Sequence, residues 1–415
     1  MSFRTATTSK WAELKQGLEQ RKQADFDWEH GKVALYNYKV DKGLDEAIRG
    51  AYQLYFGENA LGRKAFPSVA QLEDEVISHG LELFNCPEGG AGIFTSGGTE
   101  SIIIAVKAAR KWGRSNKPHI KDPVIIVPET AHPSFNKAAY LLDMTVVRVP
   151  MRDDFRADVD AMRNALTPDT VMIAGSAPSY SHGVFDDIES IARLAKQHDL
   201  WCHVDACLGG FLAPFVKKLG YNIPDFDFGI EGVSSLSADL HKYGYAPKGA
   251  SLSLYRTQDL KDCARFTFND WPRGAYMTYT LSGSRPAGAV AGAWAALHYL
   301  GPEGYLAAAK TVMETRDALI AGIETISALS VYHPYDLGVF IFGSNDRQVD
   351  INAVMECMRE HGWFVGSTAK PVAIHYSVNP IHAQSIDAYL SDLESSVDEV
   401  RRTERKAAFD DDTYS

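Results

Sequence analysis

Short apolar runs alternate with amphipathic segments through the middle of the chain. Helices of about 10–15 residues between buried strands indicate right-handed βαβ units in a mainly parallel central sheet with helices on both faces. This is an α/β fold. The predicted strands are Val124–Val127, Thr145–Val149, Val171–Gly175, Trp201–Val204, Val233–Leu236 and Ala250–Tyr255. The predicted helices between the first four are Ser134–Leu142, Asp158–Leu166 and Ile188–His198.

The two ends of the chain have a different pattern. Amphipathic periodicity predicts helices over residues 9–24 and 45–56, then a helix that Ser68 caps and that runs to about Phe84. Beyond about Pro302 a long helix precedes separate strands and helices. We therefore expect an N-terminal helical segment (1–56), a large α/β domain (57–301) and a smaller C-terminal α+β domain (302–415).

Composition narrows the possible functions. Lys plus Arg number 42 and Asp plus Glu 53, a formal net charge of −11. An acidic chain without a basic block argues against binding to nucleic acid or to an anionic membrane. The first 25 residues are polar and no apolar run reaches the roughly 20 residues of a membrane helix. The five cysteines have neither disulfide nor zinc spacing, so we expect a cytoplasmic protein without a metal site or membrane anchor.

Polar residues follow several predicted strands at the point where each strand ends. His132 follows the first strand, Tyr180 and His182 follow the third, and Asp205 closes the fourth. Because ligands bind beyond the carboxyl ends of such strands, these residues are candidates for one site. Taken singly, a histidine there is more often structural, and an aspartate more often caps a turn.

Two glycines precede a strongly helical run. The stretch Thr95–Ser101 reads Thr-Ser-Gly-Gly-Thr-Glu-Ser and opens a helix predicted over Ile102–Trp112. Gly97, Gly98 and Thr99 would present N–H and hydroxyl groups to an anion at the positive end of the helix dipole. The stretch is therefore a candidate phosphate cradle, although a Gly-Gly turn also simply starts helices.

The pair His241-Lys242 lies on a tight connection between the last two predicted strands. Burial there would disfavour the ammonium and lower its pKa, which would leave a neutral amine able to attack a carbonyl. Such a lysine suits a Schiff base with pyridoxal phosphate. An ionised Asp205 would then keep the pyridine nitrogen protonated, and His132 could stack on the ring. The alternative is an ordinary turn lysine.

Read together, these stretches resemble the pyridoxal-phosphate-dependent group II decarboxylase family of fold type I, and within it the sphingosine-1-phosphate lyase branch. The resemblance covers roughly residues 45 to 400. The matching motifs are Thr95–Ser101, the segment from Ala131-His132 to Ala139, His203–Phe211, Ser237–Gly249 and Gly283–Pro286.

The resemblance implies a role for each matching residue. Lys242 would be the Schiff-base lysine, Asp205 would lie at the pyridine nitrogen and His132 on the ring. Lys248 would face the substrate phosphate, and Asn59 lies in the segment that contacts substrate. The family also forms homodimers with shared active sites. The residues that would hold the cofactor phosphate are Gly97, Gly98, Thr99 and His241, with Ser284 reaching it from a partner subunit.

In one segment the chain departs from the eukaryotic lyase pattern. The histidine expected after Asn59 is missing, and Arg63 and Lys64 could offer substitute phosphate contacts. The expected activity is carbon–carbon cleavage of a phosphorylated 2-amino alcohol, similar to a sphingoid base 1-phosphate, into an aldehyde and phosphoethanolamine. His182 or Tyr180 would take the C3 hydroxyl proton. An amino-acid α-decarboxylase and a scaffold that binds a phosphorylated ligand without catalysis are the alternatives.

Overall fold

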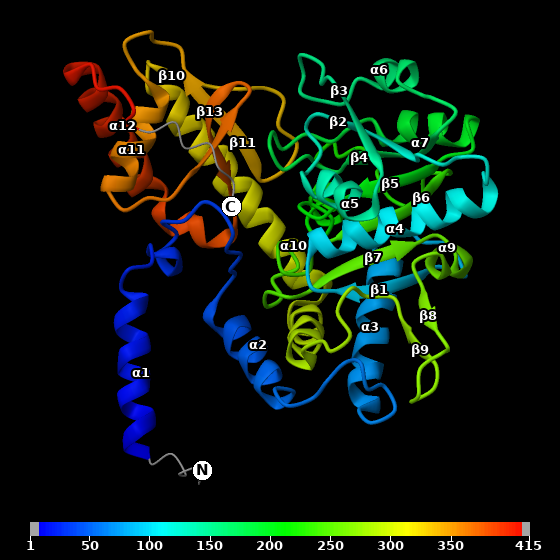
Figure 1. Ribbon diagram of the computed structural model, residues 1–415. Coiled ribbons are helices and arrows are strands. Elements are labelled where there is room, and N and C mark those ends of the chain that lie inside the picture. The colour runs from blue at the N-terminus through cyan, green and yellow to red at the C-terminus, as the bar shows by residue number, and fades with distance from the viewer. Residues whose placement is uncertain (1–7, 409–415) are drawn as a thin grey trace.

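A seven-stranded sheet lies at the centre of the larger lobe of the protein (Figure 1). The computed structural model describes residues 8–408, so residues 1–7 and 409–415 of the predicted terminal units lie outside the described residues. The strand order is β1-β7-β6-β5-β4-β2-β3. The strands are β1 (Ala91–Thr95), β2 (Val124–Pro128), β3 (Thr145–Val149), β4 (Thr170–Ser176), β5 (Trp201–Asp205), β6 (Val233–Ala238) and β7 (Ser251–Tyr255).

Pairing within this sheet is parallel from β3 through to β6, and only β7 runs in the opposite direction. The prediction of a mainly parallel sheet is therefore confirmed. The sequence pattern had not indicated β1. Because β1 and β6 both pair antiparallel with β7, they point the same way and end at the same edge of the sheet.

Helices cover both faces of this sheet, because successive strand residues point into different apolar clusters. Ile173 of β4 packs in one cluster and its neighbour Met172 in the other. The first cluster includes buried residues of α3 (Pro67–Leu83), α7 (Ile188–Gln197) and α8 (Ala213–Lys218), and the second those of α4 (Gly98–Asn116) and α5 (Ser134–Leu142). Two short helices, α6 (Val159–Asn164) and α9 (Gln258–Asp262), complete the large domain.

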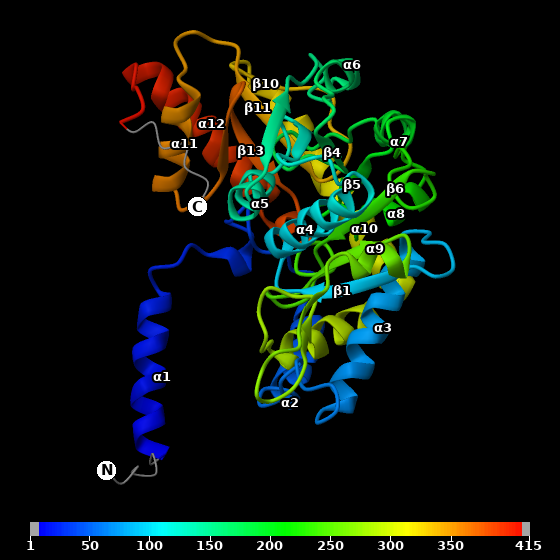
Figure 2. The same cartoon turned by 45° about the vertical axis from the view of Figure 1, so that its right-hand side comes forward.

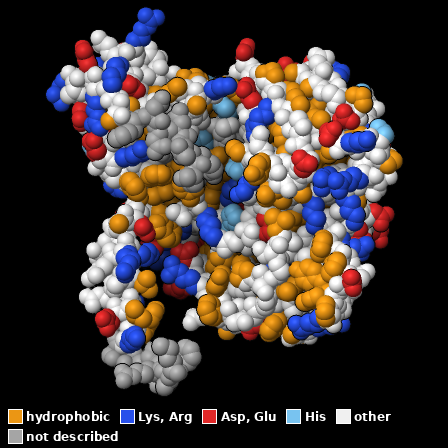
Figure 3. Space-filling model, in the orientation of Figure 1, with side chains coloured by type: hydrophobic (Ala, Val, Ile, Leu, Met, Phe, Trp, Pro, Cys, Tyr) orange, Lys and Arg blue, Asp and Glu red, His pale blue; other side chains and the backbone are white. Residues whose placement is uncertain are grey.

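A second, antiparallel sheet forms the smaller lobe, with the order β10-β11-β13-β12. The predicted smaller C-terminal α+β domain is therefore present. Histidine side chains come to the surface along the junction of the two lobes (Figure 3). The elements are β10 (Leu329–Val331), β11 (Val339–Ser344), α11 (Ile351–Glu360), β12 (Gly366–Ala369), β13 (Val372–Ser377), a 3-10 helix (Pro380–Ser385) and α12 (Ile386–Thr403).

The long helix α10 (Ala287–Thr325) crosses the predicted domain boundary. Gly301 leaves the helical conformation (φ 55°, ψ −176°) immediately before Pro302, so the chain kinks there and resumes as helix. A proline ring clashes with the preceding helical turn, which explains a kink at this point. The boundaries at residues 57 and 302 remain predictions.

Only part of the N-terminal segment packs against the two lobes. Helix α1 (Thr8–Lys22) stands apart from the rest of the chain in both views, whereas α2 (Lys42–Leu54) lies beside α10 (Figures 1 and 2). Between them, the Ala34 N–H donates to the carbonyl of Phe364 in the small domain, at 2.9 Å. A hairpin of β8 (Phe266–Phe268) and β9 (Tyr276–Thr278) extends from the large domain.

Ser68 does not cap α3 as predicted. The helix begins at Pro67, and Phe66 occupies the capping position without a side-chain hydrogen bond. A proline suits the first helical position because the N–H that it lacks would have no partner there. Among the helices of residues 8–408, none combines the length and apolar character that a bilayer crossing requires.

Candidate active site

A pocket of about 360 Å³ opens where the strands of the large sheet end. Residues that follow β1, β2, β4, β5 and β6 converge on it, which is the placement expected of a ligand site in such a sheet. The predicted residues that line this pocket are Gly97, Gly98, Thr99, His132, Tyr180, Asp205, His241 and Lys242. Four other predicted residues, Asn59, His182, Lys248 and Ser284, are not part of its lining.

Lys242 lies in the turn after β6 and forms an ion pair with Asp239, at 3.0 Å between Nζ and Oδ2. Burial alone would lower the pKa of Lys242, but the Asp239 carboxylate outweighs it and holds this pKa above its usual range. The sequence-based expectation of a neutral amine is therefore wrong for this structure. Lys242 must lose a proton to become a nucleophile.

Asp239 is the counter-charge that the sequence analysis did not single out. It is 2 % exposed, its Oδ2 also lies 3.5 Å from Nε2 of His241, and its Oδ1 has no hydrogen-bond partner. Burial favours its neutral form, but Lys242 and His241 together keep the pKa of Asp239 well below its ordinary value. Its position three residues before Lys242, in a turn, was the available signal.

The glycines at the start of α4 leave space where side chains would not fit. A Cβ atom on Gly98 would lie 2.8 Å from Sγ of Cys207 and 2.9 Å from Oδ2 of Asp239. A Cβ atom on Gly97 would lie 3.2 Å from Cε1 of His241. The N-terminus of a 19-residue helix thus faces the pocket with bare backbone, which fits the phosphate group of pyridoxal phosphate.

Hydroxyl groups orient His132. The Ser134 N–H donates to Nδ1 of His132 (3.2 Å), and the Ser134 hydroxyl lies 2.8 Å from the same nitrogen. Nδ1 is therefore the acceptor, and Nε2 carries the hydrogen. Thr99 completes the chain, with its hydroxyl 3.0 Å from that of Ser134. Burial lowers the pKa of His132, so the flat neutral ring suits stacking on an aromatic cofactor.

Asp205 is the second carboxylate of the pocket. It is 7 % exposed and its Oδ1 accepts from the backbone N–H of Cys207 at 3.1 Å. The Ser237 hydroxyl lies 3.4 Å from the same oxygen and accepts a weak hydrogen bond from the Cys207 thiol. The pocket therefore contains a buried carboxylate, that of Asp205, and a flat ring, that of His132. These are the groups expected to contact a pyridinium ring.

Lys248 lies beside the pocket. Its Nζ donates to the backbone carbonyls of Tyr36 and His241, the latter at 3.1 Å, and lies 5.3 Å from the centre of the Tyr38 ring. Lys248 is exposed as a residue, although its Nζ makes these three contacts. Burial, and then the like charge of Lys242, lower the pKa of Lys248 to about 8.

Asn59 and Ser284 lie next to each other, with Nδ2 of Asn59 donating to Oγ of Ser284 at 2.9 Å. The amide oxygen of Asn59 accepts from the backbone N–H groups of Leu61 and Arg285. The structure therefore brings these two predicted residues together, outside the set that lines the Lys242 pocket.

The two candidate bases lie on one loop but differ in orientation. Tyr180 lines the pocket, with its ring centre 6.0 Å from Nζ of Lys242. His182 is 5 % exposed, stacks on Phe155 at 4.6 Å and has its Nε2 2.8 Å from the carbonyl oxygen of Lys370. Burial lowers the pKa of His182, so its neutral ring uses this N–H for that carbonyl.

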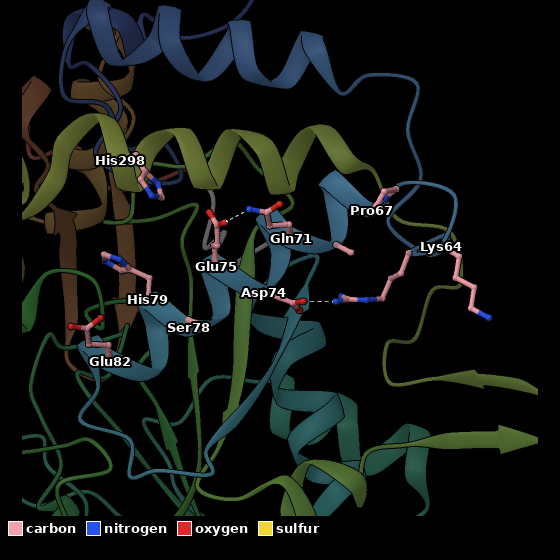
Figure 4. Close-up of a pocket in the computed structure, with 11 residues that line it drawn as sticks. Lys64, Pro67, Gln71, Asp74, Glu75, Ser78, His79, Glu82 and His298 are labelled. Atoms are coloured by element: carbon pink, nitrogen blue, oxygen red, sulfur yellow. Dashed lines mark hydrogen bonds and ion pairs between the residues drawn. The ribbon is translucent and has the colours of Figure 1, made fainter.

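Arg63 and Lys64 border a different cavity, a cleft of about 750 Å³ along α3 (Figure 4). This cleft shares no residue with the Lys242 pocket. Arg63 is engaged there by two carboxylates, Glu73 at 3.0 Å and Asp74 at 2.6 Å. The suggestion that these two residues replace a phosphate contact finds no support in their position.

Comparisons with known proteins agree with this chemistry. Residues 54–343 match the family described as "Pyridoxal-dependent decarboxylase conserved domain". A sphingosine-1-phosphate lyase of Oryza sativa subsp. japonica is 40% identical over 392 residues, which cover 92% of this chain and 72% of that protein. A probable L-tyrosine/L-aspartate decarboxylase of Methanothermobacter thermautotrophicus is 32% identical over 345 residues, which cover 82% of this chain and 91% of that protein.

A solved structure gives the same result. The sphingosine-1-phosphate lyase of Burkholderia pseudomallei superposes with a TM-score of 0.90 at 34% identity, covering 97% of this chain and 93% of that one. The cofactor is pyridoxal phosphate, and the family resemblance drawn from the motifs is confirmed. The chain belongs to the pyridoxal-dependent decarboxylase family, in the branch that contains the sphingosine-1-phosphate lyases.

Proposed function

We propose that the protein is a carbon–carbon lyase that cleaves a phosphorylated 2-amino alcohol of the sphingoid base 1-phosphate type into an aldehyde and phosphoethanolamine. One observation carries the proposal: 40% identity over 92% of the chain to a protein named sphingosine-1-phosphate lyase. The pocket supports it, because its buried lysine, carboxylates and glycine-bounded helix start suit the cofactor that this cleavage needs.

Within the pocket, each group has a separate task. Bound there, pyridoxal phosphate supplies a ring that withdraws the electron pair of the broken bond. Asp205 would hold a proton at the pyridine nitrogen, and His132 would cover one face of the ring. The residues that we assign to the cofactor phosphate are Gly97, Gly98, Thr99 and His241, with Ser284 supplied by the partner subunit of a homodimer.

The ion pair with Asp239 keeps a proton on Nζ of Lys242. While the ion pair is intact, Nζ of Lys242 is an ammonium and cannot attack a carbonyl. Lys242 and His241 keep the pKa of Asp239 low, so it remains a buried anion that suits a positively charged amine. We assign Lys242 as the lysine that attaches the cofactor.

The group that receives the C3 hydroxyl proton must lie within hydrogen-bond reach of it. Tyr180 borders the pocket, whereas the ring of His182 is directed to the carbonyl of Lys370. We therefore assign this task to Tyr180 and regard His182 as a support of the same loop.

The ammonium of Lys248 is the second positive charge near Lys242, and we assign it to the substrate phosphate. A phosphate dianion would replace the two carbonyls that hold it now. Asn59, next to Ser284, would contact substrate at the mouth of the site. We further propose a cytoplasmic protein that takes a small phosphorylated amine as substrate.

Product analysis tests the activity. Purified protein loaded with pyridoxal phosphate is incubated with sphingoid base 1-phosphates of different chain lengths and, separately, with amino acids. We expect an aldehyde and phosphoethanolamine in equal amounts from the former. Release of carbon dioxide from an amino acid, with no aldehyde from any phosphorylated amino alcohol, would establish the α-decarboxylase alternative instead.

A further inference from the structure

The loop Ser179–Val184 after β4 carries Tyr180 into the pocket. The loop is closed at its base, where the Ser179 N–H donates to the carbonyl of Val184 at 2.8 Å and the Gly183 N–H to the carbonyl of Ser179 at 2.9 Å. Its base is thus held by its own hydrogen bonds. The direction of its tip depends on what the tip contacts.

The small domain holds the end of this loop. The Asp336 N–H donates to the carbonyl of Gly183 at 3.0 Å, and the Phe185 N–H donates to Oδ2 of Asp336 at 2.7 Å. Gly183 has a φ of +72°, and a Cβ atom on it would collide with the carbonyl oxygen of Val339 in β11. The backbones of the two domains therefore meet at a position that only glycine fits.

The tip of the loop contacts the small domain twice, through Nε2 of His182 at the carbonyl of Lys370 and through a histidine of the small domain at Tyr180. Nε2 of His375, in β13, lies 2.8 Å from the carbonyl oxygen of Tyr180, and the two rings are 4.8 Å apart. His375 is 3 % exposed, and burial lowers its pKa to about 4. The ring is neutral at pH 7, and since Nε2 faces a carbonyl, Nε2 carries the hydrogen and donates it.

We propose that His375 is a positioning residue: its hydrogen bond to the Tyr180 carbonyl fixes the Tyr180 side chain in the pocket from the opposite domain. The catalytic consequence rests on the proposed function, whereas the restraint on the loop does not. A displacement of a catalytic group by about 1 Å can lower a rate by about 10²-fold, so one backbone hydrogen bond at this point can affect kcat strongly.

The same domain offers a matched control. His382 is 1 % exposed, its pKa is also lowered to about 4 by burial, and its Nε2 lies 3.0 Å from the carbonyl oxygen of Val33. His382→Leu and His375→Leu each remove one hydrogen bond from Nε2 to a backbone carbonyl, and the first variant also loses the bond that Nδ1 of His382 accepts from the Asn379 N–H. Only the second one reaches Tyr180.

Hydrogen–deuterium exchange measures the restraint without substrate. In His375→Leu the amides of residues 179–184 should exchange roughly two- to tenfold faster, the effect of losing one hydrogen bond. In His382→Leu they should exchange as in the wild type. His375→Gln keeps an N–H donor and should retain slow exchange. Fast exchange in His375→Gln at an unchanged melting temperature, or equal exchange in both leucine variants, would overturn the proposal.

A double-mutant cycle links the restraint to Tyr180. His375→Leu should lower kcat by about ten- to a hundredfold and change KM little, and His375→Gln should restore most of it. In a Tyr180→Phe background His375→Leu should add less than about threefold, because the group that it positions is already gone. Fully additive losses would refute the role of His375. Absence of activity in the wild type would refute only the proposed function, because the exchange result stands by itself.

Discussion

Two cavities of the large domain, the cleft along α3 and the Lys242 pocket, differ in size and in how their charged groups are paired. The cleft along α3 has a volume of about 750 Å³ and the Lys242 pocket about 360 Å³. In the cleft the guanidinium of Arg63 is shared by two carboxylates, Asp74, which is 62 % exposed, and Glu73, which is 5 % exposed. In the pocket the Asp239 carboxylate is buried and keeps one oxygen without a partner. Volume alone therefore does not identify the site, because the smaller cavity is the one that contains the buried ion pair of Lys242 and Asp239.

Replacing Lys242 should abolish the catalytic function that we assign to the pocket and not to the cleft. We expect Lys242→Ala to abolish turnover, and borohydride reduction should no longer fix the cofactor covalently to the chain. Removing the ammonium also takes away the nearer of the two basic groups beside the buried Asp239 carboxylate, which should lower the melting temperature. The measurements are activity, the mass of the reduced protein and thermal unfolding.

Lys248→Ala is the control for the Lys242 variant, because it changes a nearby lysine without touching Asp239. It should keep the covalently reducible cofactor. If Lys242→Ala still carried cofactor fixed by borohydride, another lysine would have to be the point of attachment.

Changing the charge of Asp205 should have the next largest effect. Asp205→Asn preserves the shape and can still accept from the Cys207 N–H, but it cannot hold a proton at the pyridine nitrogen. We expect cofactor binding within about threefold of the wild type and a kcat lower by about 10²- to 10³-fold, as for other preorganised electrostatic groups. A nearly unchanged kcat would leave Asp205 as a turn cap only.

Lys248 should control substrate binding. A charge-assisted contact contributes about 1.5–3 kcal/mol, so Lys248→Met should raise KM for a phosphorylated amino alcohol about ten- to a hundredfold. The cofactor should remain bound. A KM that responds equally for an unphosphorylated amine would contradict a phosphate contact.

The pKa of Lys248 also predicts a pH effect. Because this pKa is lowered to about 8, the ammonium is lost as the pH rises through 8, and kcat/KM for the phosphorylated substrate should decrease above that value. Lys248→Arg keeps its charge at higher pH and should remove this decrease. A decrease of the same size in the arginine variant would assign it to another group.

The smallest effect is expected in the cleft. Lys64 is exposed and lines the α3 cavity, so Lys64→Met should leave kcat/KM within about twofold and the melting temperature nearly unchanged. It is the matched comparison for Lys248→Met. A tenfold rise in KM would show that Lys64 does replace the missing phosphate contact.

The positions of the site residues could be predicted because chemistry-bearing residues follow strands. His132 and Asp205 were placed by the strands before them, and both line the pocket. The phosphate cradle was placed less securely, because β1 was not recognised. Its Ala-Gly-Ile-Phe-Thr sequence comes directly after glycines, which favour a turn.

The charge of Lys242 and the direction of His182 could not be predicted, because both depend on a specific partner. The pattern indicated that Lys242 is buried, and burial alone lowers the pKa of a lysine. The pKa of Lys242 is raised instead, because the turn after β6 brings the Asp239 carboxylate to its ammonium. His182 points to Lys370 of the small domain, 188 positions away, and no local spacing reports such a contact.

The Cys207 thiol, between Gly98 and Ser237, has a consequence for the oxidative stability of the enzyme. Burial, reinforced by Asp205 and Asp239, raises the pKa of Cys207 well above its usual value. Since the thiolate is the form that reacts with peroxides and electrophiles, this sulfur is chemically quiet although it borders the pocket. Asp205 and Asp239, which suit the site to a positively charged ring, therefore also keep the Cys207 thiol protonated and slow its oxidation.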